Sequence, residues 1–186
     1  TNMSTRQRIN TGMAHIPEDR HKHGLILDYT VQENLILKNY YLEPSSRRGL
    51  IDWDYVYTHA EKVIKDFDVR SGQGAEASAR SLSGGNQQKA IVGREIDGNP
   101  DLLIAVQPTR GLDVGAIEYI HQRLLEQRDQ GKAVFLVSLE LDEVLDLSDR
   151  IAVIYNGELV DVVNASETNE NEIGLMMAGG KRGAVA

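Results

Sequence analysis

The stretch that most constrains this chain is residues 82–89, Leu-Ser-Gly-Gly-Asn-Gln-Gln-Lys, which leads directly into an apolar-periodic run from Ala90 to Ile96. Ser83 is a residue type that caps helix N-termini, and the two glycines after it let a ligand come close to the backbone. Because the N–H groups of a first helical turn are unpaired, this turn is a candidate phosphate site. A plain helix cap would use the same residues, so the turn alone leaves both interpretations open.

The chain after this turn alternates between strand and helix patterns. An apolar run at 102–106 is followed by a Pro-Thr-Arg-Gly turn, a helical pattern at 114–130 and a second apolar run at 133–137. Two strands joined by a helical crossover are typical of a parallel sheet that is buried on both faces. Further on, Asn156-Gly157 between two apolar runs predicts a β-hairpin. The remaining expected elements are helices at 140–147 and 169–177 and a loose tail at 179–186.

The first half of the chain carries helix signals. Thr30 and Glu33 form a capping box before an apolar run, which predicts a helix that ends near Tyr40. Asp52 is placed to cap a second helix, which has one apolar face and runs to about Phe67. A short helix near 4–8, a strand near 12–16, and loops at 18–24, 44–49 and 71–81 complete the expectation.

Composition excludes several classes of protein. The 20 Lys and Arg against 28 Asp and Glu give a net charge of −8, which argues against a general nucleic-acid binder. The chain has no cysteine, so it has no disulfide, thiolate metal site or cysteine nucleophile. No apolar run is long enough to predict a direct membrane span, and a cytosolic location is unopposed. The start at Thr1 suggests a piece of a longer product.

Two histidines in the loop at 18–24 are the candidate metal ligands of this sequence. His21 and His23 could form a metal pair, but no third ligand of the right kind stands near them. A solvated loop is the favoured interpretation, and no metal ligand is expected in this chain.

The LSGGNQQK stretch resembles the signature motif of ABC transporter ATPases, in the variant found in importers of simple sugars and nucleosides. Residues 102–113, LLIAVQPTRGLD, resemble the Walker B strand and D-loop of that family, and the spacing between the two motifs also fits. Residues 16–20 and 24–37 look like the corresponding stretch in the second ATPase domain of those importers. The resemblance covers nearly the whole chain and implies the C-terminal part of that second domain.

The resemblance implies an α/β fold, namely an incomplete P-loop NTPase (RecA-like) core with a parallel sheet and a helical subdomain insertion. Residues 1–17 would end the first part of the ATPase core. Residues 18–97 would form the helical signature subdomain. Residues 98–186 would form the second part of the core, with a C-terminal hairpin and tail.

The residues that would act on the domain's own nucleotide are changed. In the family pattern, the metal-holding aspartate falls on Val106, the catalytic glutamate on Gln107 and the switch histidine on Leu139. Valine holds no metal, an amide is not a base, and leucine donates no hydrogen bond. The phosphate-loop motif is absent, since its nearest lookalike, Gly179-Gly180-Lys181, is followed by arginine. We therefore expect no catalytic residue here and no turnover by this chain alone.

The residues that the family offers to a partner's nucleotide are kept. They are Ser83, Gly84 and Gly85 of the signature and Asp113 of the D-loop, and Gln87 is counted with them. In the family, the signature closes over ATP that the facing domain holds, so the implied cofactors are ATP and Mg²⁺, bound mainly by that domain. Asp113 is equally suited to cap the helix that begins at Val114, and the two roles can coexist. Glu18 stands about where the family's Q-loop glutamine lies.

The resemblance implies an ATP-binding component of an ABC importer for nucleosides or simple sugars. Its partners would be a facing ATPase domain and transmembrane permease subunits, and it would sit peripherally at the cytoplasmic face of the cell membrane. The alternative is a non-catalytic dimerisation and permease-docking module that does not use nucleotide. An unrelated fold with a chance LSGG is a third possibility. The intact signature and the order of the motifs favour the first interpretation.

Overall fold

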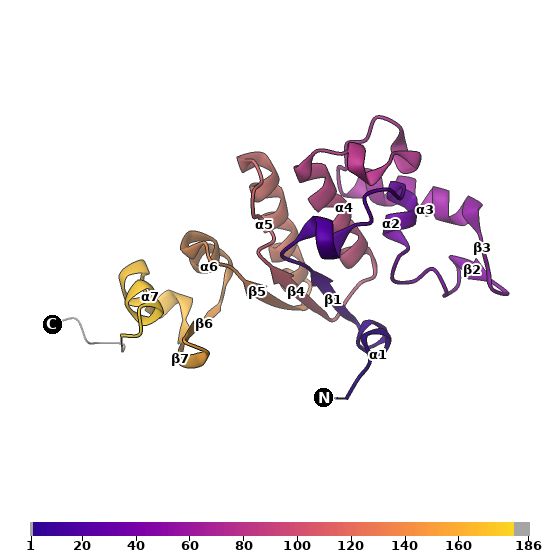
Figure 1. Cartoon of the computed structure of the whole chain (residues 1–186). Helices are drawn as coiled ribbons and strands as arrows, with labels where there is room; N and C mark the ends of the chain where they lie inside the picture. The colour runs from indigo at the N-terminus through magenta and orange to yellow at the C-terminus, as the bar shows by residue number, and fades with distance from the viewer. Residues whose placement is uncertain (1, 181–186) are drawn as a thin grey trace. The chain divides into compact units, whose positions relative to one another are not determined.

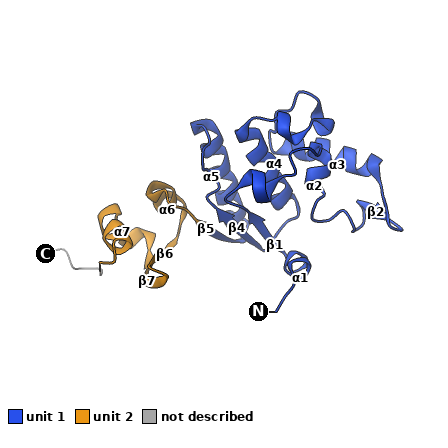
Figure 2. Ribbon diagram, viewed as in Figure 1, with its two compact units in different colours: residues 1–135 blue, residues 136–186 orange. Residues whose placement is uncertain are grey.

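The computed structural model describes residues 2–180 of the 186-residue chain. It contains two compact units, residues 1–135 and 136–186 (Figure 2). The first unit contains α-helices and strands, which Figure 1 labels, and short η turns, which it does not label. They are α1 Thr5–Asn10, β1 Met13–Ile16, η1 Arg20–Gly24, α2 Val31–Leu35, β2 Ser46–Arg47, β3 Leu50–Ile51, α3 Trp53–Asp66, η2 Gly74–Glu76, η3 Ala79–Ser81, α4 Gly84–Asp97, β4 Leu102–Val106 and α5 Val114–Asp129.

A parallel sheet forms the centre of this unit. Strand β1 pairs with β4 in parallel, from Met13 opposite Leu102 to Ile16 opposite Ala105. Strand β5, Ala133–Val137, follows in the order β1-β4-β5, and α5 supplies the crossover between β4 and β5. Helices α4 and α5 lie beside one another next to the strands (Figure 1). The predicted parallel α/β core is confirmed, and the strand at 133–137 has the predicted bounds.

The helical part of the unit packs α2, α3 and α4 around a shared apolar core. Val56, Ala60 and Val63 of α3 are buried on one face of the helix, as its periodicity predicted. A β-carbon on Gly93 of α4 would lie 3.0 Å from Val63 Cγ1, so the absence of a side chain lets α4 approach α3 closely. The core also includes Val31, Leu35, Ile91 and Val92.

Both predicted caps of this part are present. The Thr30 hydroxyl accepts from the Glu33 N–H and the Glu33 side chain accepts from the Thr30 N–H, which forms the capping box. Asp52 caps α3 by accepting from the Tyr55 N–H at 3.1 Å. Helix α2 nevertheless ends at Leu35 rather than near Tyr40. The apolar residues beyond it continue in separate turns, in which the Asn39 and Tyr40 N–H groups donate to the Ile36 carbonyl.

Three segments predicted as loops contain regular structure. Residues 20–24 form a π-helical turn, which begins where the Asp19 carboxylate accepts from the backbone N–H groups of His21 and Lys22. Residues 46–51 contain the antiparallel pair β2 and β3, with Ser46 opposite Ile51. Residues 71–81 contain the 3₁₀ turns η2 and η3. These elements are two to five residues long, so they carry too few positions for a periodic pattern to predict.

A buried ionic group links the sheet to the helices. The Glu95 carboxylate is 3% exposed. It accepts from the His15 N–H of β1 at 3.0 Å and from Arg94 Nε at 2.9 Å, and it forms an ion pair with Lys38. Burial lowers the pKa of Lys38, and the Glu95 charge opposes part of that shift. Arg94 also donates to the Gly24 carbonyl at 2.8 Å, so the charges of this group are multiply paired.

The second unit is built on a hairpin. Its elements are α6 Leu141–Leu147, β6 Arg150–Tyr155, β7 Glu158–Asn164, η4 Ala165–Glu167 and α7 Glu170–Met177. The predicted hairpin at Asn156-Gly157 is confirmed, with both turn residues at positive φ, 49° and 80°. Its core is Ile151, Val153, Val163, Ile173 and Met176. Of the predicted tail, residues 181–186 lie outside the described part, and the predicted division into 1–17, 18–97 and 98–186 stays a prediction.

Candidate functional site

The signature turn begins α4 with a serine cap. Ser83 is exposed and has extended backbone, and its hydroxyl accepts from Asn86 Nδ2 at 2.9 Å and from the Asn86 N–H at 3.4 Å. Within residues 2–180, the backbone N–H groups of Gly84 and Gly85 donate to no acceptor. Two unpaired donors at the positive end of a 14-residue helix fit an anionic group such as a phosphate.

The two glycines of the turn have close neighbours on both sides. A β-carbon on Gly85 would lie 3.3 Å from Ala116 Cβ of α5 and 3.8 Å from Asp113 Oδ2. A β-carbon on Gly84 would lie 3.1 Å from Arg20 Nη2. The turn is therefore held between the N-terminus of α5 and the segment that follows β1.

Asp113 stands at this junction as the cap of α5. Its Oδ1 accepts from the Ala116 N–H at 2.9 Å, and the residue is exposed. The structure therefore brings Asp113 beside Gly85, although 28 residues separate them in the chain. The capping role predicted for Asp113 is confirmed, whereas a role toward nucleotide stays a prediction.

The two glutamines that follow the signature glycines point into the protein. Gln87 is 5% exposed, and its Nε2 donates to the Ala79 carbonyl at 3.0 Å while its Oε1 lies 2.9 Å from His21 Nε2. Both ends of the Gln87 amide are thus engaged beneath the turn, and its predicted contact with nucleotide stays a prediction. Gln88 is also buried and donates to the Pro108 carbonyl at 2.7 Å, which ties α4 to the turn after β4.

Two positions at which the sequence departs from the family pattern lie at the end of β4. Val106 and Gln107 are both half-buried, and Gln107 has a φ of 48°, a left-handed conformation that is uncommon for a residue with a side chain. The Gln107 carbonyl accepts from the Arg110 N–H at 3.2 Å, which closes a turn at 107–110. Leu139, in the second unit, is 77% exposed. Among the described residues, no group of three or more His, Asp or Glu is placed to hold a metal ion.

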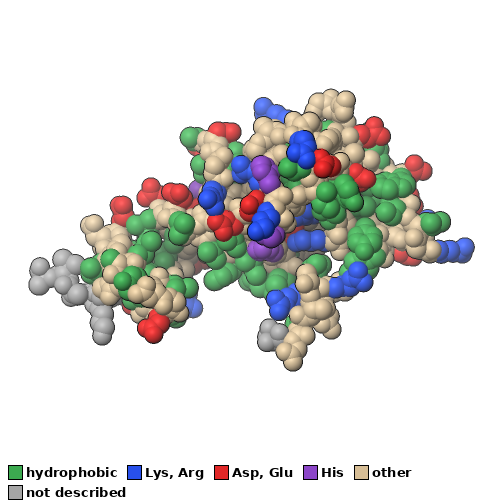
Figure 3. Space-filling view, in the orientation of Figure 1, with side chains coloured by type: hydrophobic (Ala, Val, Ile, Leu, Met, Phe, Trp, Pro, Cys, Tyr) green, Lys and Arg blue, Asp and Glu red, His purple; other side chains and the backbone are tan. Residues whose placement is uncertain are grey.

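The segment after β1 contacts the turn after β4 through charged side chains. Glu18 Oε1 accepts from Arg110 Nη1 at 2.5 Å, and Arg20 Nη1 donates to the Arg110 carbonyl at 3.0 Å. Figure 3 shows histidine and basic side chains gathered, together with carboxylates, over the middle of this unit. Of these three residues, the sequence singled out only Glu18, about where the family's Q-loop glutamine lies. It gave no role to Arg20 or Arg110. The partners are 90 and 92 residues apart, and no local pattern signals such a contact.

The described residues contain no helix that is both long and apolar enough to cross a lipid bilayer.

The fold is that of ATP-binding cassettes. It matches the dimeric post-hydrolysis cassette MJ0796 bound to ADP and phosphate with a TM-score of 0.70 and 23% identity, over 88% of this chain and 68% of that chain. It matches the cassette MJ1267 with a TM-score of 0.73 and 20% identity, over 96% of this chain and 72% of that chain.

Sequence relatives narrow this class, although no family model matches the chain. The guanosine import ATP-binding protein NupO of Bacillus subtilis is 56% identical over 96% of this chain and 35% of its own length. The nucleoside import ATP-binding protein NupA of Lactococcus lactis is 54% identical over 97% of this chain and 35% of its own length. The glucose import ATP-binding protein TsgD13 of Haloferax volcanii is 44% identical over 97% and 33%.

This chain belongs to the ABC ATPases of the sugar and nucleoside importer type. It spans about a third of the length of the curated relatives it matches.

Proposed function

We propose that this chain is the C-terminal part of the second ATPase domain in the ATP-binding subunit of an ABC importer. In that protein it supplies the signature turn to a composite ATP site, and a facing ATPase domain supplies the phosphate loop. Hydrolysis at that site drives transport through permease subunits. The whole subunit lies peripherally at the cytoplasmic face of the membrane.

The observation that carries this proposal is an asymmetry between two sets of residues, those of the signature turn and those at the end of β4. The signature turn keeps unpaired N–H groups at Gly84 and Gly85, and Asp113 stands beside them. The end of β4 has Val106 and Gln107 where the family places a metal ligand and a catalytic carboxylate. The first group of residues is suited to a nucleotide presented from outside, whereas the second offers no metal ligand and no carboxylate base.

Mg²⁺-ATP held by the facing domain would supply the γ-phosphate and its metal. The N–H groups of Gly84 and Gly85 and the Ser83 hydroxyl would bind and orient that phosphate from the opposite side. Donors aimed at developing negative charge contribute strongly to rate in a closed site, and removing one commonly costs on the order of 10²-fold. Asp113 would hold the beginning of α5 in place next to these donors through its bond to the Ala116 N–H.

The names of the relatives support a proposal for the class of solute. The proteins named for guanosine and nucleoside import are 56% and 54% identical to this chain, whereas the one named for glucose import is 44% identical. We infer that the transported class is nucleosides, and simple sugars are the alternative class.

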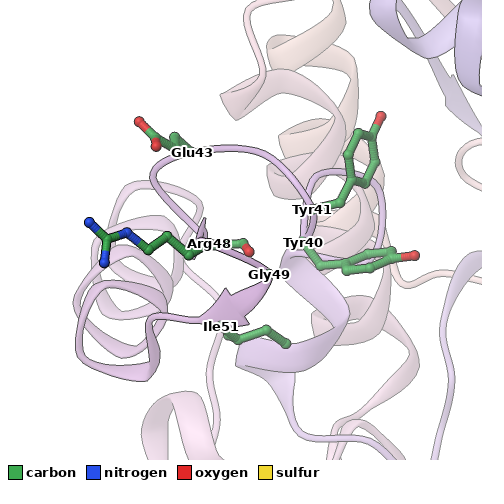
Figure 4. Close-up of a pocket in the computed structure, with 7 residues that line it drawn as sticks. Tyr40, Tyr41, Glu43, Arg48, Gly49 and Ile51 are labelled. Atoms are coloured by element: carbon green, nitrogen blue, oxygen red, sulfur yellow. The ribbon is translucent and has the colours of Figure 1, made fainter.

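The surface proposed to meet the permease is the part of the helical segment around β2 and β3. An open cavity of about 420 Å³ lies there, with Tyr40 and Tyr41 on one side and Glu43 and Arg48 on the other (Figure 4). Large apolar side chains are exposed nearby in the chain, and hydrophobic atoms reach the surface over the α2 and α3 region (Figure 3). They are Tyr40, Leu42, Leu50, Trp53 and Tyr57.

The test compares substitutions in the signature turn with a substitution at Gln107, in the full-length subunit assembled with its permease. It measures ATP turnover and solute uptake. Ser83→Arg and Gly84→Asp should abolish ATP turnover and uptake, because they add bulk or negative charge against the phosphate. Gln107→Ala should reduce turnover only slightly, because no carboxylate is lost. Equal losses from Gln107→Ala and Gly84→Asp would show that the domain's own site is active. Unchanged turnover in Gly84→Asp would instead favour the docking module that does not use nucleotide.

A further inference from the structure

Arg20, the first residue of η1, is the point where three loops meet. Its Nη1 donates to the Arg110 carbonyl at 3.0 Å. Its Nη2 lies 3.1 Å from where a β-carbon on Gly84 would stand, and 3.8 Å from the corresponding position at Gly111. One guanidinium therefore lies beside Gly84 at the start of α4 and beside the turn that precedes Asp113.

The charge of Arg20 is not compensated locally. Within residues 2–180, no carboxylate lies at ion-pair distance from its guanidinium, and its Nε is buried without a hydrogen-bond partner. The neighbouring Arg110 differs in this respect, because Glu18 pairs with it. An arginine kept half-buried with only one carbonyl acceptor costs solvation, so packing beside the two turns must offset that cost.

We propose that Arg20 is a positioning residue that sets the distance between the signature turn and the turn carrying Asp113. Its planar guanidinium is placed between the two turns, with its Nη1 fixed on the Arg110 carbonyl and its Nη2 against Gly84. In doing so it also places positive charge beside Gly84 of the signature turn. This inference rests on the proposed function for its effect on turnover, but its structural part can be tested without nucleotide.

The Glu18 and Arg110 ion pair supports this assignment from the other side. The ion pair joins the side chain of Glu18, in the segment after β1, to the side chain of Arg110. Arg20, in the same segment, joins it to the backbone carbonyl of Arg110. The Glu18 and Arg110 side chains are 53% and 65% exposed, so that ion pair alone contributes little. Arg20 is the less exposed member, and it is the one that contacts Gly84.

The first experiment is hydrogen–deuterium exchange on the full-length protein without nucleotide. Arg20→Gln should speed exchange in peptides covering 82–90 and 107–114 and leave the peptides of α3 unchanged. Arg80→Gln is the matched control, because Arg80 pairs with Asp28 at the surface, and it should change neither turn. Wild-type exchange at both turns in Arg20→Gln would overturn the proposal, as would a rise spread evenly over the protein.

The second experiment measures ATP turnover in the assembled transporter. Arg20→Gln should lower kcat on the order of 10-fold or more, because small misplacements in a reacting geometry are costly. The KM for ATP should stay near the wild-type value, because the facing domain holds the nucleotide. Arg20→Lys keeps the charge but loses the planar fork, and it should recover part of kcat. It also serves as the second variant if Arg20→Gln folds poorly.

The same assay separates the two proposals. If Gly84→Asp abolishes turnover while Arg20→Gln keeps the wild-type kcat, the positioning role is wrong and the proposed function stands. If Gly84→Asp keeps full turnover, the proposed function fails, and the exchange experiment alone decides the role of Arg20.

Discussion

Gly85 of α4 lies against Ala116 of α5 so closely that a β-carbon on Gly85 would stand 3.3 Å from Ala116 Cβ. Gly85→Val should therefore lower the free energy of unfolding by about 1–3 kcal/mol, because the extra methyl groups force the two helices apart. Urea unfolding followed by the fluorescence of Trp53, the single tryptophan, reports on this unit.

Gly72→Val is the matched control for Gly85→Val. Gly72 has ordinary φ, and a β-carbon there would meet nothing within 4 Å. Its free energy of unfolding should stay within about 0.5 kcal/mol of wild type, as is usual for surface changes. Equal effects at Gly72 and Gly85 would contradict the close approach of α4 to α5.

The buried Glu95 group should dominate the stability of the first unit. Glu95→Ala leaves Arg94, Lys38 and the His15 N–H without their shared acceptor. Removing one member of a buried ionic group typically costs about 3–5 kcal/mol, because the remaining charge is desolvated and unpaired. Denaturant unfolding of the variant measures the loss.

Asp28→Ala provides the comparison for Glu95→Ala. Its carboxylate also pairs with an arginine, Arg80, but the two side chains are 79% and 61% exposed. An exposed pair contributes at most about 1 kcal/mol, so this variant should unfold close to the wild-type midpoint. A loss as large as that of Glu95→Ala would show that burial is not what makes Glu95 important.

Local signals predicted the longer helices and strands of this fold, whereas they predicted neither its short elements nor the contacts between elements. Ser83, Asp52 and Asp113 all cap the helices assigned to them, because a cap depends on residues within one turn. The burial of Gln87 and the contacts of Arg20 depend on partners 66 and 90 residues away. From the sequence, such polar residues are expected to be exposed. For this reason the contacts of Arg20 were not predicted.

The ion pair between Lys89 and Asp68 predicts a pH effect. Lys89 Nζ donates to Asp68 Oδ2 at 2.6 Å, and this bond holds the pKa of Asp68 below its usual value of 3.8. A carboxyl with a lowered pKa in the folded state stabilises the fold above pH 3.8, and this contribution is lost as pH falls through the lowered value. In Lys89→Met, NMR titration should place the pKa of Asp68 closer to 3.8.

Asp19 is the internal reference in that titration. Its pKa is also lowered, but by the backbone N–H groups of Lys22 and His21, which Lys89→Met leaves in place. The pKa of Asp19 should stay low in the variant. If both carboxyls shift together, the change is global and does not report on the Lys89 bond.

The permease contact predicts a pattern of crosslinks in membranes. The 186 residues contain no cysteine, so each introduced cysteine is the single one in this part of the subunit. Arg48→Cys and Leu50→Cys on the β2–β3 hairpin should capture a permease subunit, because both positions are exposed beside the open cavity and Leu50 is 76% exposed. Ser45 immediately precedes β2 but is only 3% exposed, so a cysteine there should react poorly. Glu118→Cys, exposed on α5, is the control and should capture none. If Glu118→Cys captures the permease while the hairpin cysteines do not, the docking surface lies on α5, and the helical segment has another role.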